Sequence, residues 1–430
     1  MSESALRTSM KHSPVGWVPS AWETVSLGDV ATLQTGIAKN SKASCQSKVA
    51  LPYLRVANVQ DGYVDLTEIK YIDVEASRVS RYLLQKGDVL FNEGGDFDKL
   101  GRGCVWQGQI SPMVHQNHVF SVRCGHRVMP EYLAQYSASP VGKRFFLVSS
   151  RQTTNLATIN STQLRAFPVP LPPLPEQRKI AAILSSVDTT IERTEALIAK
   201  LRDLRTAMMQ ELLTKGIGHT RFKDSPLGRI PEEWEVVRLG ECVDSLITYG
   251  IVQAGPHVPG GIPYIRTGDM AGDHLERQGM LCTSSAIADS FNRSRVQTGE
   301  IVCAIRATVG KVLLVPADLD GANLTQGTAR IAPRKGVDPH FLLWAIRSGP
   351  VQYKLRLAVK GTTFSEITLA ELRKIQVPLP MRKEERAKIA AMLDCVQTQL
   401  DARALRLARL HSLKKALMQD LLTGRVRAEA

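Results

Sequence analysis

Few residues of this chain have the types and the spacing that chemistry requires. Asp61, Asp65, Glu68 and Lys70 form a loose Asp…Glu-x-Lys pattern, of the kind with which some nucleases hold a metal ion. The pattern is short enough to be common by chance, and the chain does not repeat it where its other motifs recur. A stand-alone nuclease or methyltransferase with an unrecognised active site stays open as an alternative interpretation.

The motifs of common catalytic and cofactor-binding sites are missing from the sequence. It has no G-x-G-x-x-G turn, no G-x-x-x-x-G-K-[ST] loop and no N-P-P-[FY] signature of amino-methyltransferases. It also has no H-E-x-x-H or G-x-S-x-G motif. We therefore predict a binding and spacing protein rather than an enzyme, with no catalytic residue, cofactor or metal of its own.

The charge balance predicts a polyanionic partner. The 430 residues include 55 Lys and Arg against 41 Asp and Glu, a net charge of +14. Nucleic acid is favoured over a membrane, because the chain carries neither a basic amphipathic anchor nor a lipidation signal. A basic protein without such a partner is the alternative.

Composition predicts a cytoplasmic protein with a sizeable core. Apolar residues make up 43% of the chain and charged residues 22%, which is ordinary for globular domains. The N-terminus lacks the apolar core of a signal peptide, and no apolar run is long enough to span a membrane. Seven scattered cysteines without a C-x-x-C pair favour buried free thiols over a zinc site or disulfides.

The chain is built from an internal repeat. "SPVGWVPSAWETVSLG" from Ser13 matches "SPLGRIPEEWEVVRLG" from Ser225, with nine of sixteen positions identical. Further pairs follow in the same order: "LPYLRV" and "IPYIRT", "KGDVL" and "TGEIV", "PEYLAQYSASPV" and "PHFLLWAIRSGPV", "TTNLATI" and "TTFSEIT". The repeat closes on "VPLPPLPEQRKIAAIL" and "VPLPMRKEERAKIAAML". The offset drifts only from 212 to 208 residues, so the two halves share one fold.

Each half predicts a mixed domain of about 150 residues followed by one long helix. Short β-branched runs between turn signals predict strands, and "PEYLAQYSAS" and "PHFLLWAIRS" predict short helices that begin at proline. The expected fold class is α/β (α+β): two similar mixed domains separated by a pair of long antiparallel coiled-coil helices, related by a pseudo-two-fold repeat. Trp22 and Trp234 hold matching positions and are expected in the core.

An apolar heptad seam runs through both long helices. Its apolar positions are Ile180, Leu184, Val187, Ile191, Ile198, Leu201, Ile389, Leu393, Val396, Leu400, Leu407 and Leu410. Polar residues interrupt both seams at the same places, Thr194/Arg403 and Arg205/Lys414, where they could set the register or face a partner; the alternative is that these positions are solvated edges of the seam. Two equivalent seams in one chain most simply pair with each other; the alternative is that each helix packs on its own domain.

Two variable domains alternating with two similar helices, each led by "VPLP" and "KIAA" and closed by "LLT", resemble the DNA-specificity (S) subunit of type I restriction–modification enzymes. The resemblance covers Ser13 to about Thr423. It implies that each domain reads one half of a bipartite, interrupted site on double-stranded DNA. It also implies that the helices set the spacing and dock methyltransferase (modification) subunits, which restriction/motor subunits join. S-adenosylmethionine, ATP and Mg then belong to partner subunits.

The expected boundaries follow the repeat. They are an N-terminal tail 1–12, target-recognition domain 1 at 13–172, spacer helix 1 at 173–216, a linker 217–224, target-recognition domain 2 at 225–380, spacer helix 2 at 381–424 and a C-terminal tail 425–430. The second junction departs from the first, with "PMRKEER" in place of "PPLPEQR", which could alter the local turn.

Polar residues in Gly-rich loops after strands are the expected DNA contacts, because backbone there can approach a duplex and side chains can reach base edges. In domain 1 they are Asn92, Glu93, Asp96, Lys99, Arg102, Gln116, Asn117, His118, Arg151, Thr153, Thr154 and Asn155. In domain 2 they are Arg266, Arg306, Thr308, Lys311, Thr325, Gln326, Lys360, Thr362 and Thr363. Arg55 and Arg266 follow the same strand in both halves, which predicts a phosphate or scaffold role rather than base reading.

Overall fold

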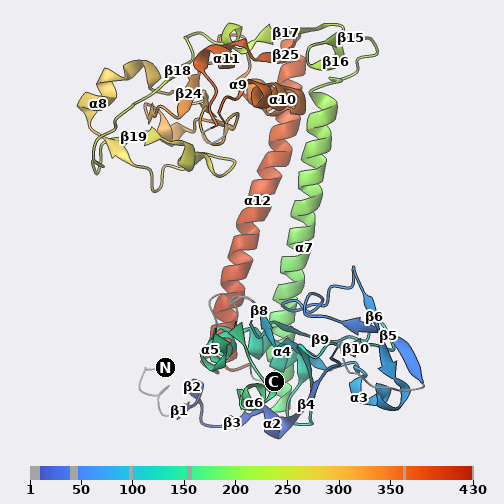
Figure 1. The fold of residues 1–430 in the computed structure, drawn as a ribbon. Helices are drawn as coiled ribbons and strands as arrows, with labels where there is room; N and C mark the ends of the chain where they lie inside the picture. Colours follow the sequence, from blue (N-terminus) through green and yellow to red (C-terminus); the bar gives the residue numbers. More distant parts are fainter. Residues whose placement is uncertain (1–9, 39–46, 96–99, 153–156, 362–364, 429–430) are drawn as a thin grey trace. The chain divides into compact units, whose positions relative to one another are not determined.

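The computed structural model describes residues 10–38, 47–95, 100–152, 157–361 and 365–428. The chain folds into two compact units, Met1–Glu195 with Leu405–Ala430 and Ala196–Ala404. Each unit contains one mixed domain and half of each long helix, α7 (Leu174–Leu212) and α12 (Lys383–Leu421) (Figure 1). The long helices are confirmed, and each ends a few residues before the expected boundary.

The domain of the first unit is built on two sheets. An antiparallel sheet has the order β4-β11-β7-β9, and a mixed sheet has the order β10-β5-β6, in which β5 and β10 run parallel. The strands are β4 (Ala31–Thr35), β5 (Lys48–Leu54), β6 (Lys70–Glu75), β7 (Val89–Asn92), β9 (Gly103–Val105), β10 (Val114–His115) and β11 (Val119–Cys124). A small sheet joins β8 (Gly94–Gly95), β12 (Arg151–Gln152) and β13 (Ala157–Thr158). The helices are α2 (Leu27–Val30), α3 (Val79–Tyr82), α4 (Pro130–Ala138), α5 (Pro140–Ser149) and α6 (Ser161–Arg165).

The domain of the second unit repeats the two larger sheets strand for strand, and isolated bridges of Glu366 with Arg306 and Lys360 take the place of the small sheet. Its sheets have the orders β18-β24-β21-β22 and β23-β19-β20, and β19 and β23 again run parallel. The strands are β18 (Thr248–Tyr249), β19 (Ile262–Ile265), β20 (Cys282–Thr283), β21 (Ile301–Ala304), β22 (Val312–Leu314), β23 (Asn323–Leu324) and β24 (Thr328–Ile331). The helices are α8 (Ser285–Ser290), α9 (Pro339–Arg347), α10 (Gly349–Ala358) and α11 (Leu369–Lys374). The predicted mixed fold and its duplication are confirmed.

The proline-rich junctions are strands rather than plain connectors. β14 (Pro168–Leu171) pairs with β3 (Glu23–Ser26), and β25 (Gln376–Pro380) pairs with β17 (Trp234–Arg238), both antiparallel. Each is a two-stranded ladder, in which a proline lacking N–H can lie on the unpaired side. The chain therefore leaves each domain beside the strand on which it entered.

Segments expected as tails and a linker also carry regular structure. A hairpin of β1 (Met10–Ser13) and β2 (Gly16–Pro19) opens the first domain, and β15 (Phe222–Ser225) and β16 (Gly228–Pro231) open the second. Gly216 and Gly424 adopt the left-handed conformation expected of residues that follow a helix end.

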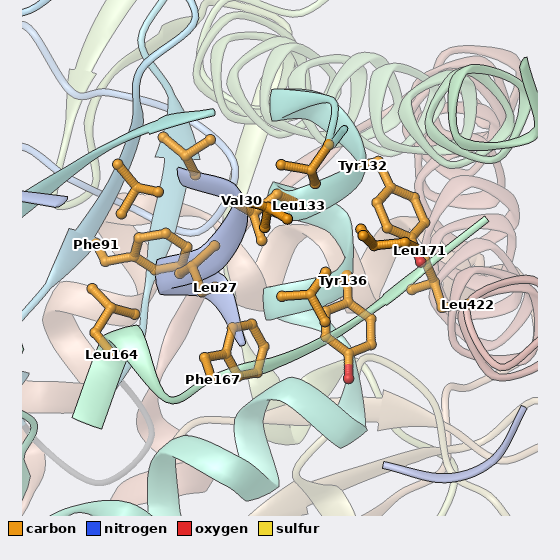
Figure 2. Packing of buried hydrophobic residues seen from close by; sticks show 14 of the residues in the cluster. Leu27, Val30, Phe91, Tyr132, Leu133, Tyr136, Leu164, Phe167, Leu171 and Leu422 are labelled. Carbon is orange, nitrogen blue, oxygen red and sulfur yellow. The ribbon is translucent and has the colours of Figure 1, made fainter. Parts of the chain in front are cut away.

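The core of the first unit joins the domain to both helices. Phe91, Tyr136 and Phe167 lie in one cluster with Ile180 of α7 and Leu421 of α12 (Figure 2). In the second unit Trp234 and Trp344 cluster with Leu213, Ile389 and Leu393. The helices thus pack on each other and on the domains, so the two interpretations of the seam are both partly right. None of the twelve seam residues is exposed: Val187, Leu201, Leu407 and Leu410 are half-buried, and the others are buried.

Both seam breaks at Arg205 and Lys414 make polar contacts across the helix pair. Arg205 donates to the Gln397 side chain at 2.5 Å, and Lys414 pairs with Asp188 at 2.6 Å. The two pairs hold matching positions of the repeat, and both require the helices to run antiparallel. The break at Thr194 is satisfied within α7 by a bond to the Thr190 carbonyl. A polar pair within an apolar seam disfavours slipped registers, so these contacts fix the alignment of the helices.

A carboxylate at the start of each helix, buried at Glu176 and half-buried at Glu385, holds the domain to the chain segment that follows the other helix. Trp22 Nε1 donates to Glu176 at 3.2 Å, and Arg427 forms a bidentate pair with the same carboxylate at 2.7 Å for both bonds. In the second unit Trp234 Nε1 donates to Glu385 at 3.3 Å, with His219 Nε2 at 2.8 Å. We call these two sites the first and second clasp.

The next residue of each junction makes matching bonds in spite of its different identity. The Gln177 amide donates to the Arg127 and Pro172 carbonyls, and the Arg386 guanidinium donates to the Gly336 and Pro380 carbonyls. Gly336 is the repeat equivalent of Arg127. The departure in sequence at the second junction is therefore absorbed without loss of the helix start.

Glu176→Gln should destabilise the first unit. Burial raises the pKa of Glu176, but the bonds from Arg427, Trp22 and the Ala428 amide more than offset this, so the pKa lies below its usual value. The charged clasp therefore contributes stability above the unfolded-state pKa, and this contribution is lost as pH falls through the folded-state pKa. At pH 7 we expect a loss of about 1.5–3 kcal/mol and a lower thermal midpoint, and the difference from the wild type should narrow as pH falls below the usual glutamate pKa of 4.5.

The control is Glu23→Gln, which removes the exposed ion pair with Arg127 and should cost under about 1 kcal/mol. Equal midpoints for the two variants at pH 7 would mean that the clasp does not hold the unit together.

Candidate functional site: two matching loop edges

Loops from several strands of each domain meet at one edge of its sheets. In the first domain they follow β5, β7 and β10, at residues 55–58, 93–95 and 116–118. Because β5 and β10 run parallel, their carboxyl ends meet there, and β7 adds its end through β11. In the second domain they follow β19, β21 and β23, at residues 266–269, 305–307 and 325–327. We call these the first and second loop edge.

The backbones of the two edges carry the same hydrogen bonds. The Glu93 N–H donates to the His118 carbonyl, and the Ile305 N–H donates to the Gly327 carbonyl, both at 2.9 Å. The Asn117 N–H donates to Ile37, and the Gln326 N–H donates to Ile251, both at 3.0 Å. "HQNH" and "LTQG" therefore occupy one backbone position with different side chains. The two halves therefore present different side chains on a shared backbone scaffold.

A glycine in each half lets two chain segments approach closely behind the edge. A Cβ on Gly36 would lie 2.1 Å from the His115 carbonyl oxygen, and one on Gly250 would lie 1.9 Å from the Leu324 carbonyl oxygen. No side chain fits there. The two glycines therefore allow the chain to pack closely behind the loop edge in both domains. The sequence indicates this requirement, because "TGI" and "YGI" place a glycine at repeat-equivalent positions.

The first loop edge brings together most of its described candidates. His118 pairs with Glu93 at 2.5 Å, and Asn117 lies 3.3 Å from the other ring nitrogen of His118. Arg102 donates to the Gln60 side chain at 2.7 Å. Gln116 is half-buried, and Arg151 is exposed on the small sheet that pairs with Gly94 and Gly95. The candidates Asp96, Lys99, Thr153, Thr154 and Asn155 lie outside the described residues.

Asn92 does not have the placement expected of a DNA contact. Its side chain is buried, and its amide donates to the Val56 and Val59 carbonyls at 3.3 and 3.0 Å. It ties the loop after β5 to the end of β7, which is a scaffold role. The neighbouring His115 is buried as well: burial lowers its pKa to about 4, and its Nδ1 lies 2.7 Å from the Val119 carbonyl.

The second loop edge gathers Arg266, Arg306, Thr325, Gln326 and Lys360. Arg306 pairs with Glu366 at 3.1 Å, and the Lys360 backbone exchanges hydrogen bonds with the same residue. Thr325 is half-buried, whereas Gln326 and Lys360 are exposed. Ala307 adopts a left-handed φ of 61°, which turns the chain away from the edge after Arg306.

Of the DNA contacts expected in the second half, two lie away from the second loop edge and two lie in a part of the chain that the structure does not describe. Thr308 and Lys311 lie in a groove between the domain and α7, where Lys311 donates to the Ala271 carbonyl. Thr362 and Thr363 lie outside the described residues.

Arg55 and Arg266 have the scaffold character expected of residues shared by both halves. Arg55 pairs with Glu68 at 3.3 Å, and Arg266 makes a 2.7 Å bond to Asp269, which raises the Arg266 pKa. Asn58 and Asp269 cap the same turn, since each accepts the backbone N–H of the preceding arginine.

The loose nuclease pattern is dispersed into surface ion pairs. Asp61 pairs with Lys143, Asp65 accepts from Thr67, and Glu68 lies between Arg55 and Lys70, which together lower its pKa. Within the described ranges, no group of three or more His, Cys, Asp or Glu residues is arranged to hold a metal ion.

The cysteines differ in part from the expectation of buried thiols. Cys104, Cys242 and Cys303 are buried, and burial raises the pKa of Cys104 and Cys303 to about 12. Cys124 and Cys282 are half-buried, and Cys395 is exposed on α12. None of the described helices combines the length and the apolar character needed to cross a membrane.

Comparison with known proteins assigns the duplicated architecture. A sequence model of the type I restriction modification DNA specificity domain matches residues 19–203 and 231–410, one match in each half. The chain belongs to this family. The two matches cover the two domains and run into the two long helices, in agreement with the resemblance seen in the sequence.

Relatives match over nearly their full length. A Methanocaldococcus jannaschii protein, provisionally named the type I restriction enzyme MjaX specificity subunit, is 29% identical and covers 97% of both chains. The EcoBI specificity subunit of Escherichia coli is 24% identical over 96% of this chain and 88% of its own. The type I restriction-modification S subunit from M. genitalium shares the fold, with a TM-score of 0.60 at 14% identity, over 93% of this chain and 96% of that one.

Gly250→Ala should displace the second loop edge. The added methyl group would meet the Leu324 carbonyl, and overpacking of this kind costs about 1–3 kcal/mol. Hydrogen exchange should rise in residues 323–328, and the thermal midpoint of the second unit should fall. Gly268→Ala is the control, because a Cβ there meets nothing within 4 Å. Unchanged exchange in the Gly250 variant would contradict this account of the edge.

Proposed function

We propose that this chain is the non-catalytic DNA-recognition subunit of a type I restriction–modification complex. Each domain would read one half of a bipartite, interrupted site on double-stranded DNA. The observation that carries the proposal is the pair of loop edges, in which one backbone arrangement presents different side chains. Similar grooves at two half-sites call for similar modules, and different half-site sequences call for different readers. The net charge of +14 fits this partner.

The exposed and half-buried polar side chains of the loop edges are the proposed readers. Amides such as Asn117 and Gln326 suit adenine, and Arg306 suits guanine when it turns from Glu366 to the duplex. Glu93, Arg102, Gln116, His118, Arg151, Thr325 and Lys360 complete the proposed contact surface. Arg55 and Arg266 would support the edge or contact phosphate without specifying sequence.

The helices would set the half-site spacing. Thirty-nine residues at about 1.5 Å each give a rod of roughly 58 Å. The register pairs Arg205–Gln397 and Asp188–Lys414 keep that rod from slipping. The domain limits we propose are those of the repeat, 13–172 and 225–380, followed by the helices α7 (Leu174–Leu212) and α12 (Lys383–Leu421). The complex would work in the cytoplasm, and S-adenosylmethionine, ATP and Mg would bind to partner subunits.

A matched exposed stripe on the two helices is the proposed docking surface for the modification subunits. Leu204 and Leu413 hold equivalent positions and are 47% and 48% exposed. Their neighbours on the same helix face also match: Lys200/Arg409, Ala207/Ala416 and Glu211/Asp420. Such exposed matches are not needed for packing. Two copies of one partner, however, require the same surface twice.

Exchange of residues 239–375 for the same segment of another family member should change only one half of the methylated motif. The cut leaves β17, β25 and the second clasp in place, so the helix start is kept. Methylation-sensitive sequencing of host DNA reads the result, with the unmodified chain and a gene deletion beside it. A change in both halves of the motif would rule out modular reading.

Leu204→Arg and Leu413→Arg should each remove one modification subunit. Native mass spectrometry should show one bound copy for either single variant and none for the double variant. Surface substitutions of this kind change the free energy of unfolding by about 0.5 kcal/mol or less, so the thermal midpoint should be unchanged. Tyr71→Arg, at a residue 69% exposed in the first domain, is the control. Two copies bound to the double variant would exclude the stripe as the docking surface.

A further inference from the structure

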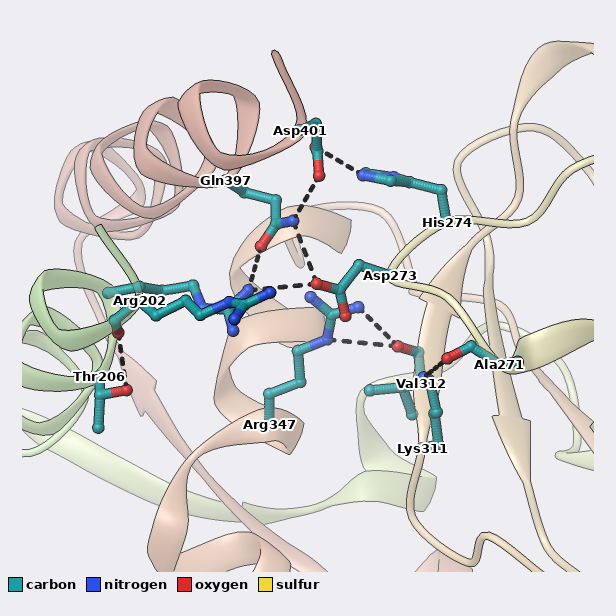
Figure 3. Close-up of polar contacts among 11 residues, drawn as sticks. Arg202, Thr206, Ala271, Asp273, His274, Lys311, Val312, Arg347, Gln397 and Asp401 are labelled. Atoms are coloured by element: carbon teal, nitrogen blue, oxygen red, sulfur yellow. Dashed lines mark hydrogen bonds and ion pairs between the residues drawn. The ribbon is translucent and has the colours of Figure 1, made fainter. Parts of the chain in front are cut away.

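The second unit contains a basic groove that the loop edge does not explain. Its cavity of about 1120 Å³ lies between α7 on one side and helix α10 with residues 307–312 on the other. Arg205, Lys311, Arg347 and Arg356 line it, against one carboxylate, Asp273. We call it the basic groove; Figure 3 shows Asp273, Lys311 and Arg347 around it.

Three of the four cations have no carboxylate partner within ion-pair distance in the described part of the chain. Arg205 pairs with Asp273 at 3.3 Å, whereas Lys311 donates to a backbone carbonyl. Arg347 donates to the Val312 carbonyl at 2.9 Å and stacks on Trp344 at 5.0 Å. Burial lowers the Arg347 pKa and Arg205 adds to this effect, whereas Asp273, Asp394 and Asp401 oppose it. Burying the Arg347 guanidinium costs desolvation free energy, and an anion that enters the groove would offset part of that cost.

The start of α10 adds polar groups to the groove. Ser348 is its N-cap residue, and its side chain makes no cap hydrogen bond. At the equivalent start of α5, the Ser139 side chain accepts from the Gly142 N–H. Ser348 and Gly349 both line the cavity, so the positive end of this ten-residue helix faces it.

The first unit has the opposite charge at the related place. A cavity of about 540 Å³ lies between its domain and the helices, and five carboxylates line it: Asp61, Glu131, Asp188, Glu192 and Glu195. Lys143, Lys414 and His411 are its only basic residues among those described. A partner present in two identical copies would meet opposite charges in the two grooves, so the basic groove is not a repeated docking site.

The basic groove is continuous with the second loop edge. The Ala307 N–H, next to Arg306, donates to the Ser365 carbonyl, and both residues line the groove. Thr308 and Lys311 follow Arg306 in the chain and line the groove, so the backbone of a duplex bound at the second loop edge would lie beside them. Charge and continuity therefore favour a nucleic acid backbone over an acidic peptide as the occupant.

We propose that the basic groove binds phosphates of the spacer DNA next to the half-site read by the second domain. The proposal rests on the proposed function and extends it: spacer contact is one-sided, because the acidic groove of the first unit repels phosphate. Lys311 and Arg356 contact the backbone from the rim, and Arg347 provides charge from the floor. These contacts position the duplex and do not read its sequence.

The test uses the assembled complex with its modification subunits and a cognate duplex. Lys311→Gln with Arg356→Gln should lower affinity about 10- to 100-fold and reduce the slope of log K against log salt by about 2, since each lost phosphate contact removes about 0.9. The methylated motif should not change. Lys143→Gln on α5, which lines the acidic groove, is the matched control and should leave the slope unchanged.

Neutral methylphosphonate linkages locate the contact. Placed in the spacer beside the second half-site, they should weaken binding of the wild-type complex and not of the double variant; beside the first half-site they should affect neither. The proposal is overturned if the double variant has the wild-type salt slope, or if neutral linkages beside the two half-sites weaken binding equally. The proposed function would still stand in either case, provided that the complex binds its cognate duplex. Weaker subunit assembly with an unchanged slope would assign the groove to a protein partner. Loss of all sequence preference in the wild-type complex would instead refute the proposed function.

Discussion

The fold depends on a carboxylate at the first turn of each long helix, buried at Glu176 and half-buried at Glu385. Glu176 and Glu385 each accept from the indole of the domain's own tryptophan and from the segment that follows the other helix. A buried charge is tolerated only when its bonds are complete, so domain, helix start and incoming chain must assemble together. The loop edges can then be variable, because the elements that hold each domain to its helix lie at the junction, away from them.

The repeat and the helices could be predicted from the sequence because they rest on local patterns. Heptad spacing, proline junctions and matched motifs all act over a few residues, and the structure confirms the seam burial and the mixed domains. The clasps could not be predicted in this way. Trp22, Glu176 and Arg427 are separated by 154 and 251 residues, and the second copy uses His219 in place of Arg427. The helix dipole alone is enough to explain an acidic residue at the position of Glu176, so the sequence hides its tertiary role.

The candidate site shows the same limit at the level of single side chains. Gly-rich polar loops correctly indicated where the strands end, but not which side chains turn inward. Asn92 sits at the end of a fully buried strand, and its amide satisfies two carbonyls of the neighbouring loop. Lys311 lies a few residues beyond Arg306, yet the left-handed turn at Ala307 directs it to the helix side of the domain. The positive φ of Ala307, which the sequence does not indicate, lies between Arg306 at the loop edge and Lys311 in the groove.

Duplication creates two copies of every surface. Surfaces that still match and surfaces that have diverged are then expected to serve different purposes. Buried positions match because one fold must be built twice. The exposed stripe at Leu204 and Leu413 matches although packing does not require it, which fits a partner bound twice. The loop edges and the two grooves differ, and the grooves differ in the sign of their charge. Because an interrupted DNA site has two different halves, a reader derived from identical halves would have to become asymmetric where it reads bases, and it could stay symmetric where it contacts its subunits or, as at Arg55 and Arg266, supports the loop edge or contacts phosphate.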